Sequence, residues 1–487
     1  MSSLSCRHEI YRHRMQAEWR PSIPLPEDPL PDTLEKELLE LGDDSSFLSL
    51  ANCLAALKAQ QATHKPSEQQ ANIQDTIEDL LELSWEKLHH GNWKDVSPAW
   101  RQVYGWSAFL KAYCQLFLPS SSSQAATSTF TVAHCKSIMR TLDLALLMAG
   151  PACSVPRKAF EDLISFTQQK LKEEEEKNET SEAATNHTKK KARTRTNATD
   201  GATRSLKRTT TKGGPPALNS KCGIERVHVP SLERFYKDFM SKERPVIVTG
   251  LMDTWPALQD EQRRWSNLEY LKRVAGCRTV PVEIGSTYLE EDWSQRLMTF
   301  DQFVDDYVLQ VPKEDGKEDE EGEEGGKIGY LAQTQLFEQI PELYGDIRLP
   351  DYCALSVSEE KMNGEEEEEE ETERKLVIHC WFGPEGTVSP LHHDPYHNLL
   401  AQVVGRKYIR LYSVKESPKL YPHPSTMLFN TSQVAVEEPN LERFPLFAEA
   451  EYTECILEAG EMLYIPPKHW HYVRSLSISF SVSFWWE

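Results

Sequence analysis

The stretch that most constrains the fold is residues 476–484, in which apolar residues and serines alternate strictly. Side chains on a β-strand point alternately to its two faces, so this pattern predicts a strand. One face should be buried, and the serine face should line a polar cavity or meet solvent. Such a strand requires other strands to pair with it.

Several other runs have the length and composition of short strands. They are residues 244–250, 280–284, 376–382, 398–404 and 407–412. Turn residues such as Gly and Pro separate most of these runs from their neighbours. Many short strands divided by turns favour a β-sandwich or barrel of jelly-roll type.

The N-terminal part of the sequence has the periodicity of helices instead. In residues 73–88 and 100–113, large apolar side chains recur at spacings of three and four, which is typical of amphipathic helices. We predict a bundle or irregular array of five or six helices, with the aromatic residues in its core. A helical-repeat module that binds protein partners is an alternative, although we find no fixed repeat period.

Changes in composition divide the chain into four parts. We predict a disordered N-terminus at 1–32, a helical domain at 33–171, a linker at 172–223 and a β-rich domain at 224–487. The linker contains a basic run at 189–195 and further basic residues at 204–208. This run resembles a nuclear localisation signal, which favours the nucleus, with the cytoplasm as a further location. The alternative is a solvated tether.

The charge and cysteine content exclude several classes of protein. The formal net charge of −22 argues against direct nucleic-acid binding, although much of it lies in two acidic insertions, near 314–326 and 364–373. The 10 cysteines form no Cys-x-x-Cys pair, so we expect a reducing compartment and neither a zinc ribbon nor a disulfide framework. No signal peptide or run of about 20 apolar residues suggests a membrane segment.

His392 and Asp394 are the most informative polar pair. His392 is the only one of the 15 histidines that is followed two residues later by Asp or Glu. On an extended segment both side chains point the same way. Together with a second histidine, they would form the two-histidine, one-carboxylate set that binds non-haem Fe(II) and leaves coordination positions open. A His-x-Asp pair in an ordinary turn is the alternative.

The residues after this pair predict a hairpin next to the ligands. Asp394-Pro395 should form a turn, and a short Gly405-Arg406 connection separates the strands at 398–404 and 407–412. As a hairpin partner, Lys407 would lie close to His392 and Asp394. It would then be a buried cation, whereas the alternative is an ordinary edge-strand lysine.

A set of short motifs resembles the JmjC-domain 2-oxoglutarate oxygenases. The motifs are residues 381–384, 389–395 and 405–412, Asn398 and the Phe-Trp-Trp run at 484–486. The resemblance covers the C-terminal half well and the helical part more loosely. It implies an α+β chain, in which an all-α N-terminal domain precedes a double-stranded β-helix of the jelly-roll or cupin type.

The same resemblance implies a metal ion and a co-substrate. Fe(II) would be bound by His392, Asp394 and His471, and 2-oxoglutarate would be consumed with O2. His471 matches the histidine that ends the family's motif, with His469 as the alternative third ligand. The other two nearby histidines are not expected to bind the metal, because His393 should point to the opposite face of the strand and His397 should lie in the turn.

The remaining pocket residues also follow from the resemblance. Lys407 would bind the distal carboxylate of 2-oxoglutarate through a charge-assisted hydrogen bond. Donors, an amide and aromatic walls would come from Tyr330, Trp381, Ser389, Asn398 and Trp485.

The implied activity is C3 hydroxylation of an arginyl residue in a protein substrate, such as a histone or a ribosomal or chromatin-associated protein. Histone lysine demethylation and cleavage of histone tails are alternatives within the family, and a non-catalytic cupin-like scaffold is an alternative from another class. Glu283 and Trp293 are the candidate substrate contacts, because a carboxylate can pair bidentately with a guanidinium while an indole stacks on it. Otherwise Glu283 faces solvent and Trp293 belongs to a core.

Overall fold

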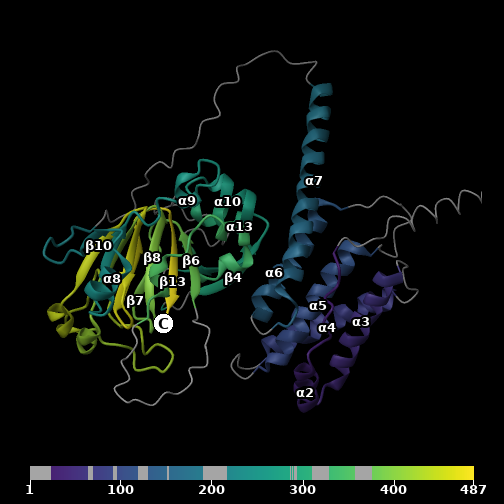
Figure 1. The fold of residues 1–487 in the computed structure, drawn as a ribbon, viewed down its shortest axis with the longest axis horizontal. Coiled ribbons are helices and arrows are strands. Elements are labelled where there is room, and N and C mark those ends of the chain that lie inside the picture. The colour runs from purple at the N-terminus through teal and green to yellow at the C-terminus, as the bar shows by residue number, and fades with distance from the viewer. Residues whose placement is uncertain are drawn as a thin grey trace, which may run out of the picture. The chain divides into compact units, whose positions relative to one another are not determined.

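The computed structural model describes residues 23–63, 70–90, 96–118, 130–150, 153–189, 216–285, 287, 289, 293–309, 328–356 and 376–487. The chain forms two compact units, Met1–Asp200 with Cys277–Thr279, and Gly201–Gly276 with Val280–Glu487 (Figure 1). Both acidic insertions and, beyond Lys189, the basic linker residues lie outside the described part. None of the described helices is both long and apolar enough to cross a membrane.

The first unit consists of helices. They are α2 (Asp32–Glu40), α3 (Asp44–Thr63), α4 (Gln70–His89), α5 (Pro98–Phe117), α6 (Val132–Ala149) and α7 (Arg157–Lys189). Helix α5 packs against both α4 and α6, and its stripe, which includes Trp100, Trp106 and Tyr113, is buried as predicted. The prediction is wrong for Trp85 of α4, which is 38 % exposed.

Part of the N-terminus that was predicted to be disordered is ordered. Ile23, Leu25 and Leu30 are buried in the core of the helical unit. The Gln61 side chain accepts a hydrogen bond from the Leu25 backbone N–H (3.1 Å) and donates one to the Ile23 carbonyl (3.2 Å). This segment has no helical period because it packs as an extended strap, so sequence periodicity could not detect it. Residues 1–22 lie outside the described part.

The last helix also extends further than the sequence suggested. Helix α7 continues to Lys189, whereas the helical domain was predicted to end at residue 171. The added residues are rich in Glu and Lys, which favour helix. Ion pairs three residues apart, such as Lys170–Glu173, stabilise the exposed helix further.

The second unit contains two β-sheets. The nine-stranded sheet has the order β1 (Arg226–His228), β2 (Val246–Thr249), β11 (Glu461–Ile465), β8 (His397–Val404), β13 (Ser479–Trp486), β6 (Val377–Gly383), β5 (Gly329–Thr334), β3 (Thr279–Ile284) and β4 (Ser294–Thr299). The four-stranded sheet has the order β10 (Thr453–Leu457), β9 (Lys407–Tyr412), β12 (Trp470–Ser475) and β7 (Val388–His392). Two facing sheets of this kind confirm the predicted double-stranded β-helix.

Short helices accompany the nine-stranded sheet. They are α8 (Leu232–Phe235), α9 (Pro256–Gln259), α10 (Leu268–Ala275), α11 (Phe300–Phe303), α12 (Leu336–Gln339) and α13 (Pro341–Tyr344), with the turns η4 (Tyr236–Met240), η5 (Val304–Val308) and η6 (Asp351–Ala354). The turns η7 (Val414–Lys419) and η8 (Pro445–Glu449) pack with the four-stranded sheet instead. Figure 1 shows α9, α10 and α13 grouped together. Phe235 and Phe303 from these helices share a hydrophobic core with Phe480 and Phe484 of β13.

Both faces of β13 are buried. Its apolar residues enter the helix-covered core, and its serines bond to polar side chains between the sheets. Ser481 donates to Gln402 Oε1 (2.8 Å), and Trp381 Nε1 donates to Ser483 Oγ (2.8 Å). The serine face was predicted to line a polar cavity or to meet solvent. The structure shows that it faces the polar interior between the sheets.

Strands β8 and β9 do not form the predicted hairpin. Strand β8 pairs with β11 and β13 in one sheet, and β9 pairs with β10 and β12 in the other. The chain crosses between the sheets at Gly405, where φ is +72° and an added Cβ would lie 2.0 Å from the Ile478 carbonyl oxygen. Only glycine combines this backbone conformation with such close packing.

We predict that Gly405→Ala destabilises the second unit far more than Gly386→Ala. Gly386 also has a positive φ (+91°), but the atom nearest to its added Cβ is 3.7 Å away. Gly386→Ala is the control and should lower the free energy of unfolding by about 1 kcal/mol through backbone strain alone. Gly405→Ala should lower it by at least about 3 kcal/mol because of the clash. Denaturant unfolding measures both losses, and equal losses would contradict the crossing argument.

Candidate active site

Three potential metal ligands meet where β7 and β12 lie side by side. His392 ends β7 and is the Cα partner of His471 in β12. The Nε2 atoms of His392 and His471 lie 3.8 and 3.5 Å from Asp394 Oδ2. Asp394 follows the strand rather than lying in it, yet its carboxylate still reaches the two imidazoles. Within the described ranges, this is the group of side chains that could hold a metal ion.

Backbone carbonyls orient both imidazoles. His392 Nδ1 lies 2.7 Å from the Pro390 carbonyl oxygen, and His471 Nδ1 lies 3.0 Å from that of His469. If each Nδ1–H donates to its carbonyl, the Nε2 lone pairs are free to bind a metal ion. Asp394 Oδ2 is buried and forms no hydrogen bond of good geometry. This orphaned oxygen and the two oriented nitrogens fit a divalent cation.

The charges of His392 and Asp394 suit metal binding at neutral pH. Burial and the neighbouring His471 lower the pKa of His392 to about 4. Burial raises the pKa of Asp394, but the nearby His471 and His392 outweigh this effect and lower it to about 2. A neutral His392 imidazole and an ionised carboxylate are the forms that coordinate metals.

The other nearby histidines do not belong to the group that could hold a metal ion. His469 lies in the turn before β12, and it is its carbonyl, not its ring, that contacts His471. The His393 ring packs edge-on against Trp470, with centroids 4.6 Å apart. The prediction that His397 lies in the turn is wrong, because it begins β8 and its Nδ1 lies 2.8 Å from Tyr464 Oη.

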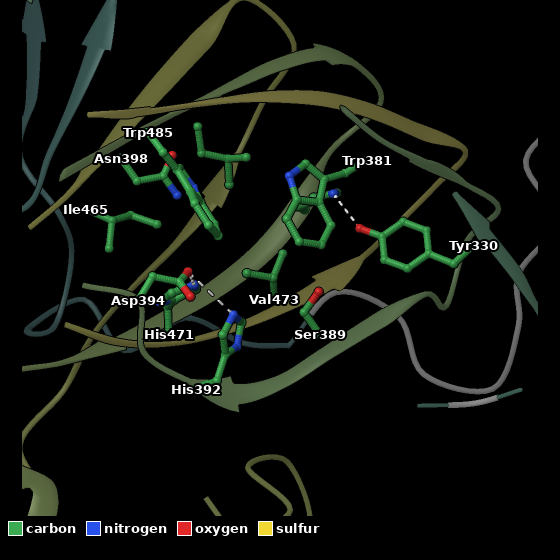
Figure 2. Close-up of a pocket in the computed structure, with 12 residues that line it drawn as sticks. Tyr330, Trp381, Ser389, His392, Asp394, Asn398, Ile465, His471, Val473 and Trp485 are labelled. Carbon is green, nitrogen blue, oxygen red and sulfur yellow. Dashed lines mark hydrogen bonds and ion pairs between the residues drawn. The ribbon is translucent and has the colours of Figure 1, made fainter. Parts of the chain in front are cut away.

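The triad lies in a pocket between the two sheets (Figure 2). The lining residues are Tyr330, Trp381, Ser389, His392, Asp394, Asn398, Leu400, Lys407, Ile465, His471, Val473 and Trp485. The structure thus brings together all the residues that were predicted to bind the metal and co-substrate. Leu400, Ile465 and Val473 were missed. Leu400 and Val473 each lie two positions after a pocket residue on the same strand and so share its face.

Lys407 lies deep in this pocket. It is only 2 % exposed, and its Nζ donates to Tyr330 Oη (3.2 Å). No described carboxylate pairs with it, and burial lowers its pKa to about 7. The side chains of His392 and Asp394 are 14 % and 15 % exposed, whereas that of His471 is 7 % exposed. His392 and Asp394 therefore mark the open end of the pocket and Lys407 the closed end.

Glu283 and Trp293 lie beside the pocket rather than in its lining. Glu283 is the Cα partner of Tyr330, and Trp293 Nε1 donates to its carboxylate (3.4 Å). Burial raises the pKa of Glu283, an effect that the Trp293 hydrogen bond opposes. Trp293 is 37 % exposed, so it does not belong to a core.

This double-stranded β-helix with its His-Asp-His triad and buried lysine has the features of the cupin-like, JmjC class of oxygenases. The comparisons agree: residues 232–487 match the family "Cupin-like domain", and residues 61–182 match "KDM8-like, N-terminal ARM repeats". The second match identifies helical repeats for which the sequence showed no fixed period.

Full-length relatives narrow the assignment. The chain is 42 % identical over 468 residues to lysine-specific demethylase 8 of Danio rerio, covering 94 % of this chain and 97 % of that protein. It is 39 % identical over 486 residues to lysine-specific demethylase 8 of Xenopus tropicalis, with the same coverage. It is 37 % identical over 420 residues to lysine-specific demethylase JMJ30 of Arabidopsis thaliana, covering 86 % and 87 %. The chain therefore belongs to the lysine-specific demethylase 8 family of JmjC 2-oxoglutarate oxygenases.

We predict that His392→Ala, Asp394→Ala and His471→Ala each abolish tight binding of Mn(II), used as a probe for Fe(II). Changing a residue that only orients a metal ligand costs about 10- to 100-fold in metal affinity. Loss of a ligand itself should weaken Mn(II) binding by more than this. Titration followed by electron paramagnetic resonance measures the affinity. His469→Ala is the control, because the carbonyl that orients His471 remains. Loss of binding in His469→Ala but not in His471→Ala would move the third ligand.

Proposed function

We propose that this chain hydroxylates C3 of arginyl residues in protein substrates, using Fe(II), 2-oxoglutarate and O2. The observation that carries the arginyl assignment is Glu283. Its carboxylate is partly buried on the strand next to Tyr330 and has no cationic partner in the described ranges. A cationic partner would stabilise this partly buried carboxylate, and a guanidinium can supply two parallel N–H donors.

Trp293 supports the same choice of substrate. Its indole N–H donates to Glu283, so the ring lies next to the carboxylate. A planar guanidinium can stack on an indole while it bonds to the carboxylate, whereas a methylated ammonium has no such planar fork. Together, Glu283 and Trp293 would hold the arginine side chain and aim its C3 carbon at the metal site.

The pocket residues would position the co-substrate. When bound, iron and 2-oxoglutarate supply the oxidising power that inserts one atom of O2 into a C–H bond, with release of succinate and CO2. His392, Asp394 and His471 would hold the metal, and Lys407 would pair with the distal carboxylate, assisted by Tyr330. Trp381, Ser389, Asn398 and Trp485 would shape the cavity and exclude water from it.

Lys407 should make 2-oxoglutarate binding pH-dependent. Since the pKa of Lys407 is about 7 without a partner and rises when a carboxylate binds, binding takes up a proton above pH 7. The dissociation constant should therefore increase with pH above 7, by up to about tenfold per pH unit. Calorimetry in the presence of Mn(II) measures this constant.

Lys407→Ala should weaken 2-oxoglutarate binding by about 100-fold or more, because it leaves a buried carboxylate unpaired, and should remove the pH dependence above pH 7. Mn(II) affinity is the internal control and should stay unchanged. An unaltered 2-oxoglutarate affinity in this variant would exclude Lys407 from the site.

Glu283→Gln tests the arginyl assignment. We expect it to suppress hydroxylation of arginine peptides, because the carboxamide cannot form the charged bidentate pair, while 2-oxoglutarate turnover without peptide continues. Arg→Lys in the peptide should have the same effect. Mass spectrometry of the peptide and succinate release measure the two activities, with the exposed Glu342→Gln as the matched control. Full peptide turnover by Glu283→Gln would refute the proposed contact.

Lysine demethylation is the second candidate function. The relatives from Danio rerio and Xenopus tropicalis are named lysine-specific demethylases, and aromatic side chains of Trp381 and Trp485 line the pocket. Loss of a methyl group from methyllysine peptides, at a rate comparable to arginine oxidation, would favour it. The complete triad with Lys407 argues against a non-catalytic scaffold. Histone-tail cleavage has no specific support among the pocket contacts.

The partners and location belong to the same proposal. An arginine-containing protein would be the substrate, the helical repeats would bind protein partners, and the nucleus would be the place of action. The supporting observations are the repeat-family match at residues 61–182 and the basic sequence at 189–195.

A further inference from the structure

We propose that a hairpin formed by residues 422–432 is a docking site for the substrate polypeptide, at the mouth of the active-site pocket. The contact residues are Met427 and Phe429, which are 69 % and 62 % exposed. The inference rests on the proposed function, since the occupant is the chain that inserts its target residue into the pocket.

The exposure of these side chains is imposed by a well-defined turn. Pro422 pairs with Ser432 at the base of the hairpin. The Thr431 N–H donates to the Leu428 carbonyl (2.9 Å), and the Met427 N–H donates to Ser425 Oγ (3.2 Å). The turn therefore holds Met427 and Phe429 away from the protein core. Exposed apolar side chains that form a contiguous patch can mark a surface that a partner buries.

The hairpin is attached directly to the metal-binding loop. Thr431 forms an antiparallel bridge with His392. The next residue, His393, donates its N–H to the Asn430 carbonyl (3.0 Å), and its own carbonyl accepts from Asn430 Nδ2 (3.0 Å). Phe429 lies in the turn directly before Asn430, so it is next to this contact with the metal-binding loop.

These contacts place the apolar tip next to the loop that carries His392 and Asp394. The pocket opens at these two residues, since the side chains of His392 and Asp394 are partly exposed whereas Lys407 is almost fully buried. A polypeptide that inserts one residue here must leave across the neighbouring surface. Adjacent extended segments lie about 4.8 Å apart, so the tip is about two to four extended residues from the target position.

The chemistry of the tip indicates what it binds. The Phe429 ring lies 6.2 Å from that of His393, centroid to centroid, which leaves its outer face free for an apolar side chain. Met427 adds a flexible thioether, which adapts to partners of different shape. Met and aromatic residues are enriched in the buried centres of interfaces. The occupant is therefore a Leu, Met or Phe side chain of the substrate. It lies about two to four residues along the substrate chain from the oxidised residue.

The test uses two peptide libraries, one centred on arginine and one on Nε-methyllysine. Each places Leu, Phe or Ser in turn at the positions within about five residues of the centre. Gain of an oxygen atom, loss of a methyl group and succinate release are measured. With the unaltered enzyme, Leu or Phe at one position should lower KM by about tenfold relative to Ser, with kcat little changed.

The double variant Met427→Ser/Phe429→Ser should lose this preference, with the KM of the Ser peptides and the peptide-independent turnover of 2-oxoglutarate unchanged. Leu441→Ser/Leu446→Ser is the matched control, because these residues are 45 % and 43 % exposed and lie in the same connection between β9 and β10. This control should keep the preference.

An apolar preference that survives in the Met427→Ser/Phe429→Ser variant would overturn the docking site. Oxidation of arginine peptides without any positional preference would overturn it too, while leaving the proposed function standing. Turnover of the methyllysine library alone would refute the arginyl assignment, and docking would then be judged by the same comparison in that library. If the enzyme turns over neither library, the proposed function and the docking site are both refuted.

Discussion

The antiparallel pairing of β7 with β12 is the constraint on which the site depends. It sets His392 opposite His471, although the two are far apart in the sequence. The carbonyls of Pro390 and His469 then orient the two rings. A shift of one residue in this register would turn one imidazole to the opposite face of the sheet. The fold thus fixes the metal ligands through backbone geometry as well as through the side chains themselves.

The same two-sheet architecture gives the pocket its polarity. Lys407 enters from β9 at the closed end, and Asn398 and Trp485 enter from the other sheet. This arrangement requires β8 and β9 to lie in opposite sheets, which the crossing at Gly405 makes possible. Burial makes the Lys407 ammonium costly without a partner, so the site is prepared for an anionic co-substrate.

Much of the fold and of the metal site could be predicted from the sequence, but only where the pattern that indicates them lies within a few residues. Alternation in residues 476–484 indicates a strand, and the unique His-x-Asp pair indicates a metal site, because both patterns lie within a few residues. The choice of His471 over His469 depended on family resemblance. The sheet crossing at Gly405 and the packing of Leu25 depend on distant contacts, with the Ile478 carbonyl and with Gln61, so no local pattern could reveal them.

The most direct test of the account is product analysis with the unaltered enzyme, Fe(II), 2-oxoglutarate and arginine-containing peptides from histone and ribosomal proteins. We predict a gain of one oxygen atom on an arginine, located at C3, with one succinate formed for each product. Loss of methyl groups from methyllysine peptides, without oxidation of any arginine peptide, would contradict the assignment and establish demethylation instead.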